Sequence, residues 1–188
     1  MNARLEMIKN LLGAGGSLYN KDYLLTWEQP VDRIKATVEL ARLFRDMHRE
    51  GADLSLFKSG LAVSLFRDNS TRTRFSYASA CDLLGLSVSD LDEKKSQIAH
   101  GETVRETATM ISFLTEVIGI RDDMFIGEGH KYMVEVGEAL DESFERGVLP
   151  QRPGIVNLQC DIDHPTQTLA DLMWLQERFP EGLEGKKI

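Results

Sequence analysis

The sequence contains few cysteines and no long apolar stretch. Only Cys81 and Cys160 are present among 188 residues, too few for a disulfide framework or a four-cysteine metal site. No apolar run approaches the ~18 residues of a membrane-spanning helix. The first thirty residues also lack the charged-then-apolar order of a signal peptide. We therefore expect a cytoplasmic protein without a membrane partner or a structural metal.

The chain also lacks an excess of basic residues. It has 22 Lys and Arg against 30 Asp and Glu, which gives a net charge of -8. This charge argues against nucleic acid or an anionic membrane as the main partner. A basic pocket for an anion would therefore be a local exception within an acidic chain.

The order of the predicted elements indicates the fold class. A hydrophobic content of 42% over this length is enough for one buried core, and for one domain or one domain with a fragment. Predicted strands alternate with predicted helices, an order that favours a parallel sheet with helices on both faces. We expect strands at residues 61–66, 87–91, 117–120 and 154–158, and helices at 2–12, 31–48, 71–84, 103–114, 133–146 and 165–178. The prediction is an α/β fold with three layers, α/β/α, around a parallel four-stranded sheet.

The clearest functional signal is the run Ser70-Thr71-Arg72-Thr73-Arg74, directly after the first predicted strand. The first amides of a helix have no partner within it and carry the positive end of its dipole, so they suit a phosphate. Hydroxyl and guanidinium groups add further donors. Residues two positions apart on a helix point to different sides, so Arg72 and Arg74 should not both face one ligand. The pattern predicts a phosphate site; a plain helix cap with two surface arginines is the alternative.

Four polar residues each follow the carboxyl end of a different predicted strand: Ser70, Gln97, Arg121 and His164. In open parallel sheets, ligands bind at that edge. The fold would therefore gather these residues on one rim. Two alternatives remain open, namely a surface ion pair of Arg121 with a neighbouring aspartate and a merely solvated Gln97.

The segment His164-Pro165-Thr166-Gln167 predicts a helix start with unusual side chains. Proline favours the first helical position, which makes His164 the cap and Gln167 the third residue. Both side chains would face the open amino end of the helix, where a ligand's carbonyl oxygen or NH2 group can be bound. A plain cap that uses histidine is the alternative.

Two further patterns in the sequence are weaker signals of function. His100-Gly101-Glu102 imitates part of a zinc deaminase motif, but the cysteine pair that should follow is missing. Cys160 near His164 suggests a thiol nucleophile, yet a cysteine at a strand end is more often a small buried apolar residue.

Four segments, in order, resemble the aspartate/ornithine carbamoyltransferases. They are Arg67 to Ser76, Ser96 to Glu102, Ile118 to Arg121, and His164 to Leu172. The stretches Ser96 to Thr107 and Gln151 to Asp171 resemble the YgeW-type knotted members in particular. The resemblance extends from about Asp22 to Ile188.

The resemblance implies an enzyme that transfers a carbamoyl group from carbamoyl phosphate to the amino group of an amino acid or similar amine. By motif, the residues that would hold the phosphate are Ser70, Thr71, Arg72 and Thr73. Those around the carbonyl oxygen would be Thr73, Arg121 and His164, while Gln167 would hold the carbamoyl NH2. Arg72, Thr73, Arg121 and His164 would then be the catalytic residues, and Arg74 a structural arginine. This chemistry requires no cofactor.

The resemblance also implies partners and domain boundaries. In ornithine-type members the glutamine matched by Gln97 reaches a neighbouring subunit, which implies a homotrimer. Residues 1–175 would form the carbamoyl-phosphate-binding domain. Residues 176–188 would end the inter-domain helix and begin a truncated amine-binding domain, so the chain as given would be incomplete for turnover. The amine acceptor stays open, and the alternative is a non-catalytic anion-binding or oligomerisation domain.

Overall fold

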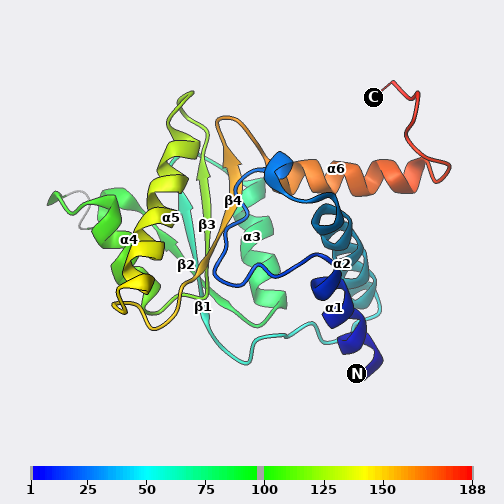
Figure 1. The fold of residues 1–188 in the computed structure, drawn as a ribbon, viewed down its shortest axis with the longest axis horizontal. Coiled ribbons are helices and arrows are strands. Elements are labelled where there is room, and N and C mark those ends of the chain that lie inside the picture. Colours follow the sequence, from blue (N-terminus) through cyan, green and yellow to red (C-terminus); the bar gives the residue numbers. More distant parts are fainter. Residues whose placement is uncertain (1, 97–99, 188) are drawn as a thin grey trace. The chain divides into compact units, whose positions relative to one another are not determined.

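The computed structural model describes residues 2–96 and 100–187 (Figure 1). The chain divides into two compact units. One combines Met1–Ser17, Thr26–Asp53 and Pro165–Ile188, and the other combines Leu18–Leu25 and Leu54–His164. Among the described residues, no helix is both long and apolar enough to cross a bilayer.

The second unit is built on a four-stranded parallel sheet. The strands are β1 (Leu61–Phe66), β2 (Ser87–Leu91), β3 (Val117–Asp122) and β4 (Gly154–Cys160), in the spatial order β2-β1-β3-β4. Helix α3 (Arg72–Leu83) covers one face, and α4 (Val104–Ser112) and α5 (Gly129–Glu145) cover the other (Figure 1). The predicted α/β fold with a parallel four-stranded sheet is confirmed.

The central strand β1 is buried on both sides, as its unbroken apolar sequence requires. Val63 and Leu65 pack into the core beneath α4 and α5, whereas Ala62 packs with Tyr77 beneath α3. Gly119 of β3 makes room on the α3 side, because a β-carbon there would lie 2.6 Å from the Tyr77 ring. The sheet therefore has two cores, one on each face.

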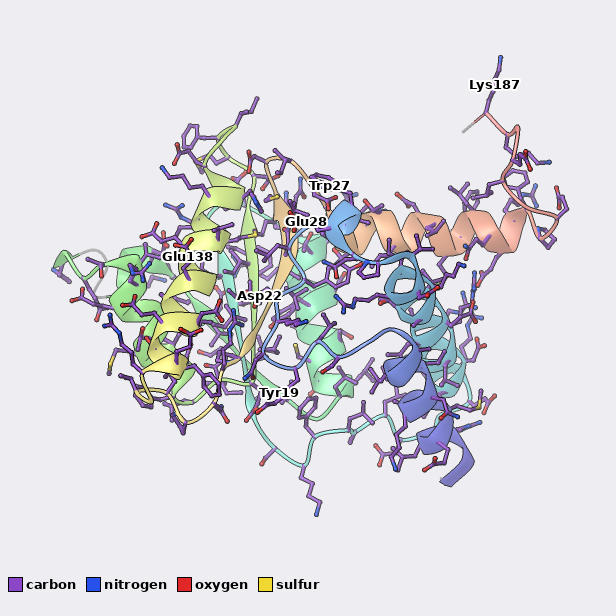
Figure 2. All side chains as sticks on the ribbon, in the orientation of Figure 1. Tyr19, Asp22, Trp27, Glu28, Glu138 and Lys187 are labelled. Carbon is purple, nitrogen blue, oxygen red and sulfur yellow. The ribbon has the colours of Figure 1, made fainter. Side chains whose placement is uncertain are left out.

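Within the sheet unit, residues 18–25 pair with β4. Tyr23 pairs with Val156 in a parallel bridge. Asp22, whose side chain is labelled in Figure 2, accepts hydrogen bonds at 2.8 and 2.7 Å from the guanidinium of Arg152. Arg152 also donates to Asp141 at 2.5 Å, although its side chain is only 2% exposed. The buried cation thus joins three separate stretches of the sheet unit.

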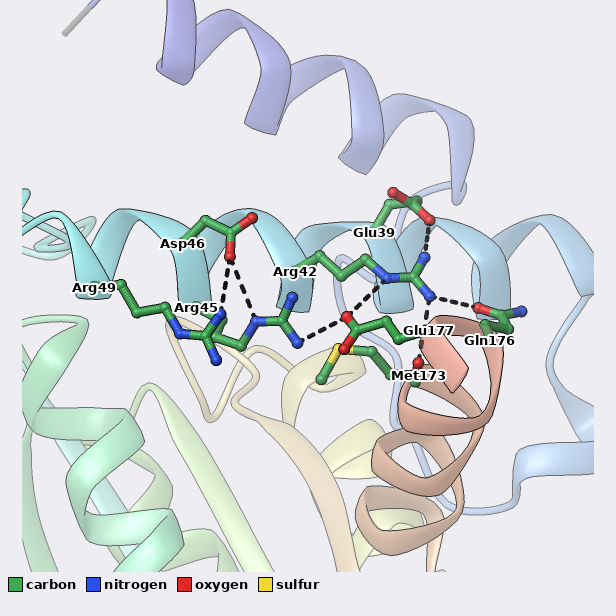
Figure 3. Close-up of polar contacts among 8 residues, drawn as sticks. All are labelled: Glu39, Arg42, Arg45, Asp46, Arg49, Met173, Gln176 and Glu177. Atoms are coloured by element: carbon green, nitrogen blue, oxygen red, sulfur yellow. Dashed lines mark hydrogen bonds and ion pairs between the residues drawn. The ribbon is translucent and has the colours of Figure 1, made fainter. Parts of the chain in front are cut away.

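The first unit is helical. It contains α1 (Asn2–Ala14), a short 3-10 helix η1 (Thr26–Glu28), α2 (Val31–Arg49) and α6 (Pro165–Arg178). Arginines of α2 bind the last turns of α6 (Figure 3). Arg42 donates to Gln176 at 2.8 Å, and Arg45 lies 2.7 Å from a carboxylate oxygen of Glu177. These contacts hold α2 and α6 together within this unit.

Element boundaries differ from the sequence predictions mainly at α5. The apolar pattern predicts a start at residue 133, but the helix begins at Gly129. The earlier start is explained by Asp161, from the loop after β4, which accepts backbone hydrogen bonds from Gly127 and His130 at 2.7 and 2.8 Å. A cap supplied from a distant part of the chain leaves no local sequence signal.

Candidate functional site

Three of the predicted site residues meet at the carboxyl edge of the sheet. Arg121 lies near the end of β3, Ser70 lies in the loop after β1, and Thr73 lies in the first turn of α3. One guanidinium nitrogen of Arg121, Nη1, donates to Ser70 Oγ at 3.1 Å and to Thr73 Oγ1 at 3.0 Å. The site thus offers one cation and two hydroxyls within a few ångströms.

Asp123 holds the other edge of the Arg121 guanidinium. Nε donates to Asp123 Oδ1 and Nη2 donates to Oδ2, both at 3.0 Å, and the two side chains are 16% and 17% exposed. The ion pair considered as an alternative role for Arg121 is therefore present. It leaves Nη1 directed at the hydroxyls, so the pairing and a place in the site coexist. A bidentate pair also restricts how the guanidinium can turn.

The start of α3 is not closed by its own cap. Thr71 is the N-cap residue, but its side chain makes no capping hydrogen bond to any described residue. The first-turn amides of α3 have no partner within the helix. The plain-cap alternative for this run is therefore not observed, and the positive end of α3 opens beside Ser70 and Thr73.

The two arginines of the run lie in different environments. Arg72 is exposed, and its guanidinium contacts none of the described residues as a hydrogen-bond or ion-pair partner. Arg74 pairs with Asp90 and lies over the Phe66 ring, with 4.3 Å between the guanidinium carbon and the ring centroid. Arg72 is available to a ligand, whereas Arg74 ties α3 to the sheet.

The remaining predicted site residues discussed are His164, Gln167 and Gln97. His164 is partly buried in the loop after β4. Gln167 is exposed in the first turn of α6, where it donates to Asp171 at 2.8 Å, and it belongs to the helical unit. Gln97 lies outside the described residues. The predicted site residues joined by direct hydrogen bonds are Ser70, Thr73 and Arg121.

The weaker patterns have structural explanations. The Glu102 carboxylate accepts a hydrogen bond from Thr107 at 2.6 Å, at the start of α4. Cys160 is buried, and its sulfur accepts from Asn157 and from the backbone of Asp163, each at 3.3 Å. Within residues 2–96 and 100–187, no group of three or more His, Cys, Asp or Glu side chains is arranged to hold a metal ion.

A second polar cluster, which the sequence did not predict, lies at the same edge of the sheet but on its other face. Arg67, directly after β1, binds Asp122 and Glu93 and stacks on Tyr132. In the sequence, Arg67 is a charged residue at the end of an apolar strand and the first residue of the family-like segment Arg67 to Ser76, but neither feature indicates its partners. Partners up to 65 positions apart in the chain cannot be paired without the fold.

Comparison with known proteins identifies the family. Residues 21–177 match the family described as aspartate/ornithine carbamoyltransferase, carbamoyl-P binding domain. The chain belongs to this family. It is 60% identical over 185 residues to a protein of Escherichia coli that carries the name of a carbamoyltransferase, YgeW; the match covers 97% of this chain and 47% of that protein.

Other family members show the same partial coverage. A catabolic ornithine carbamoyltransferase of Treponema denticola is 29% identical over 174 residues, which are 92% of this chain and 47% of that protein. The solved ornithine carbamoyltransferase of Pyrococcus furiosus superposes with a TM-score of 0.74 at 25% identity, covering 88% of this chain and 48% of that one. This carbamoyltransferase-family chain spans about half the length of the curated relatives it matches.

Proposed function

We propose that this chain supplies the carbamoyl-phosphate half of a carbamoyltransferase site. The reaction is transfer of a carbamoyl group from carbamoyl phosphate to the amino group of an amino acid or a similar amine. The observation that carries the proposal is the contact of Arg121 with Ser70 and Thr73 beside the open start of α3. Membership of the carbamoyl-P-binding family supports the choice of ligand.

The phosphate group would be held by Ser70, Thr71, Arg72 and Thr73. Hydroxyls and first-turn amides provide short donors to its oxygens, and the helix dipole favours its negative charge. The guanidinium of Arg72 is exposed and has no partner among the described residues, so it can form a charged pair with the phosphate. Arg72 would also stabilise the phosphate as it leaves.

The carbonyl oxygen of the donor would be bound by Thr73, Arg121 and His164. When the amine attacks the carbonyl carbon, a C–N bond forms and negative charge builds on that oxygen. The C–O bond to phosphate then breaks, and the departing phosphate can take the proton that the amine gives up. Donors fixed in advance stabilise this charge, as in an oxyanion hole. Gln167 would bind the carbamoyl NH2 through its side-chain oxygen.

We also propose a division of the chain and an assembly. Residues 1–175 would form the carbamoyl-phosphate-binding domain, with 176–188 leading into a second domain; the family match ends at residue 177. The protein would be a cytoplasmic homotrimer in which Gln97 reaches a neighbouring site, with a role in amino acid metabolism. Light scattering over a concentration series tests the assembly, and a strict monomer at high concentration would contradict it.

Calorimetry with two ligands tests the proposed function. Carbamoyl phosphate should bind this chain more tightly than inorganic phosphate, because only the former presents a carbonyl oxygen to Arg121. Equal affinity for both ligands would instead indicate a general anion site, as in a non-catalytic anion-binding domain. Absence of binding by either ligand would contradict the proposed function.

A further inference from the structure

Arg67 joins the ends of three strands. Its Nη1 donates to Asp122 Oδ2 at 2.7 Å at the end of β3, and its Nε donates to Glu93 Oε2 at 3.1 Å just beyond the end of β2. Its backbone N–H, directly after β1, donates to the carbonyl oxygen of Arg121 at 3.0 Å. One residue therefore contacts the carboxyl ends of β1, β2 and β3 at once.

Tyr132 of α5 contacts both Arg67 and Glu93 and completes a cluster of Arg67, Glu93, Asp122 and Tyr132. Its ring centroid lies 4.4 Å from the guanidinium carbon of Arg67, and its hydroxyl donates to the second carboxylate oxygen of Glu93 at 2.8 Å. Burial, together with the nearby Glu93 carboxylate, raises the pKa of the Tyr132 hydroxyl, which keeps it protonated as a donor. Both oxygens of Glu93 are thus bound, and Arg67 is held on three sides.

The cluster lies on the opposite face of the sheet from the candidate site. Arg121 and Asp122 are consecutive in β3, so their side chains point to opposite faces. Arg121 reaches Ser70 on the α3 side, while Asp122 reaches Arg67 on the side covered by α5. Any effect of Arg67 on the Arg121 side chain would therefore pass through the backbone of β3 and not through a shared ligand.

Arg67 supplies the positive charge that pairs with the Asp122 carboxylate. The Asp122 side chain is 4% exposed, and a buried carboxylate without a partner is costly, so loss of Arg67 would drive it toward water. Movement of Asp122 would displace the adjacent Arg121, whose hydrogen bonds to Ser70 and Thr73 are 3.1 and 3.0 Å long. Hydrogen bonds of this length weaken when the donor and acceptor move even slightly farther apart.

We propose that Arg67 is a positioning residue, which clamps the end of β3 so that the Arg121 guanidinium is already oriented for an anion. The identity of that anion as carbamoyl phosphate rests on the proposed function. The clamp itself exists without any ligand, so it can be tested without one.

The ligand-free test uses NMR of arginine side chains labelled with nitrogen-15. The Nε–H group of Arg121, assigned with an Arg121→Lys variant, should exchange slowly with solvent because it is bound to Asp123. Arg67→Ala should speed this exchange at least about tenfold by freeing the end of β3. Arg67→Lys, which keeps a cation beside Asp122, should give an intermediate rate and provides a second variant if Arg67→Ala does not fold.

Arg105→Ala is the matched control. Arg105 also pairs with two carboxylates, Glu142 at 2.5 Å and Glu138 at 3.9 Å, but on the outer helices α4 and α5. The control should cost stability without changing Arg121 exchange. If Arg67→Ala and Arg67→Lys leave the exchange of Arg121 at the wild-type rate, or if Arg105→Ala changes it equally, the positioning role is wrong.

Calorimetry then connects the clamp to ligand binding. Arg67→Ala should weaken carbamoyl phosphate binding about tenfold, and the same change should have little further effect in an Arg121→Ala background. Equal losses in both backgrounds would show that Arg67 does not act through Arg121. If the wild-type chain binds no carbamoyl phosphate, the proposed function fails, while the exchange measurement still decides the positioning role.

Discussion

Gly129 lies directly against the carbonyl oxygen of Asp122. A β-carbon on Gly129 would stand 1.8 Å from that oxygen and 3.1 Å from Oδ1 of Asp161. The first turn of α5 therefore packs on the end of β3 with no room for a side chain. This close approach places α5 immediately behind the residue that Arg67 binds.

Gly129→Ala should consequently destabilise the protein by about 2–3 kcal/mol, because backbone must move to remove the overlap. Urea denaturation measures the free energy of unfolding. Gly13→Ala is the matched control, since a β-carbon at Gly13 in α1 meets nothing within 4 Å. The control should be neutral or stabilising by up to about 1 kcal/mol. Similar effects of both changes would contradict the close packing of Gly129 against Asp122.

Substitutions of the two arginines at the start of α3 should affect different properties, ligand binding in one case and folding stability in the other. Arg72→Ala should weaken carbamoyl phosphate binding by about 2 kcal/mol, the loss of a charged hydrogen-bonding partner. Arg74→Ala should lower the free energy of unfolding by about 1 kcal/mol, because it removes the Asp90 pair and the contact with Phe66. Calorimetry and thermal unfolding measure the two effects. Equal losses of binding with unchanged stability would mean that the two roles are misassigned.

Asp161 should make stability depend on pH. Burial opposes its ionisation, but the backbone hydrogen bonds from His130 and Gly127 outweigh burial and hold the pKa of Asp161 below its usual value. Asp161 therefore contributes fully to folding stability above the pKa of an aspartate in the unfolded chain, about 3.9. This contribution is lost as the pH falls through the lower pKa of Asp161 in the folded protein.

Asp161→Asn should cost about 1 kcal/mol at neutral pH, since a neutral cap interacts less well with the start of α5. The difference between variant and wild type should shrink below about pH 4. Urea denaturation across a pH series measures it. A difference that stays constant down to pH 2.5 would rule out the ionised cap as its source.

Arg152→Ala should be the most destabilising of these single changes to charged residues. The substitution leaves Asp22, whose side chain is 14% exposed, without its bidentate partner, at a cost of about 3 kcal/mol. Arg152→Lys should recover part of the loss because it restores one charge but not the paired geometry. Chemical denaturation of both variants checks this order, and equal stability of Arg152→Ala and wild type would contradict it.

Local patterns in the sequence predicted most of the architecture. The bounds of β1, β2 and α6 agree with the prediction, and Thr103 caps α4 in a capping box with Glu106, close to the predicted start of that helix. Strand ends in a parallel sheet share one edge, so the meeting of Ser70 and Arg121 also followed from the order of elements. These features depend on periodicity and on residues close together in the chain.

The sequence by itself therefore determined the fold class, the family motifs and the residue types available to bind an anion. Only the tertiary structure decided that Asp123 pairs with Arg121, that Asp161 caps α5, and that Arg67 clamps Asp122. Apart from the short-range pair, these partners are 31 and 55 residues apart in the chain. Charged side chains have many possible partners within an acidic sequence, and only packing of the strands selects one of them.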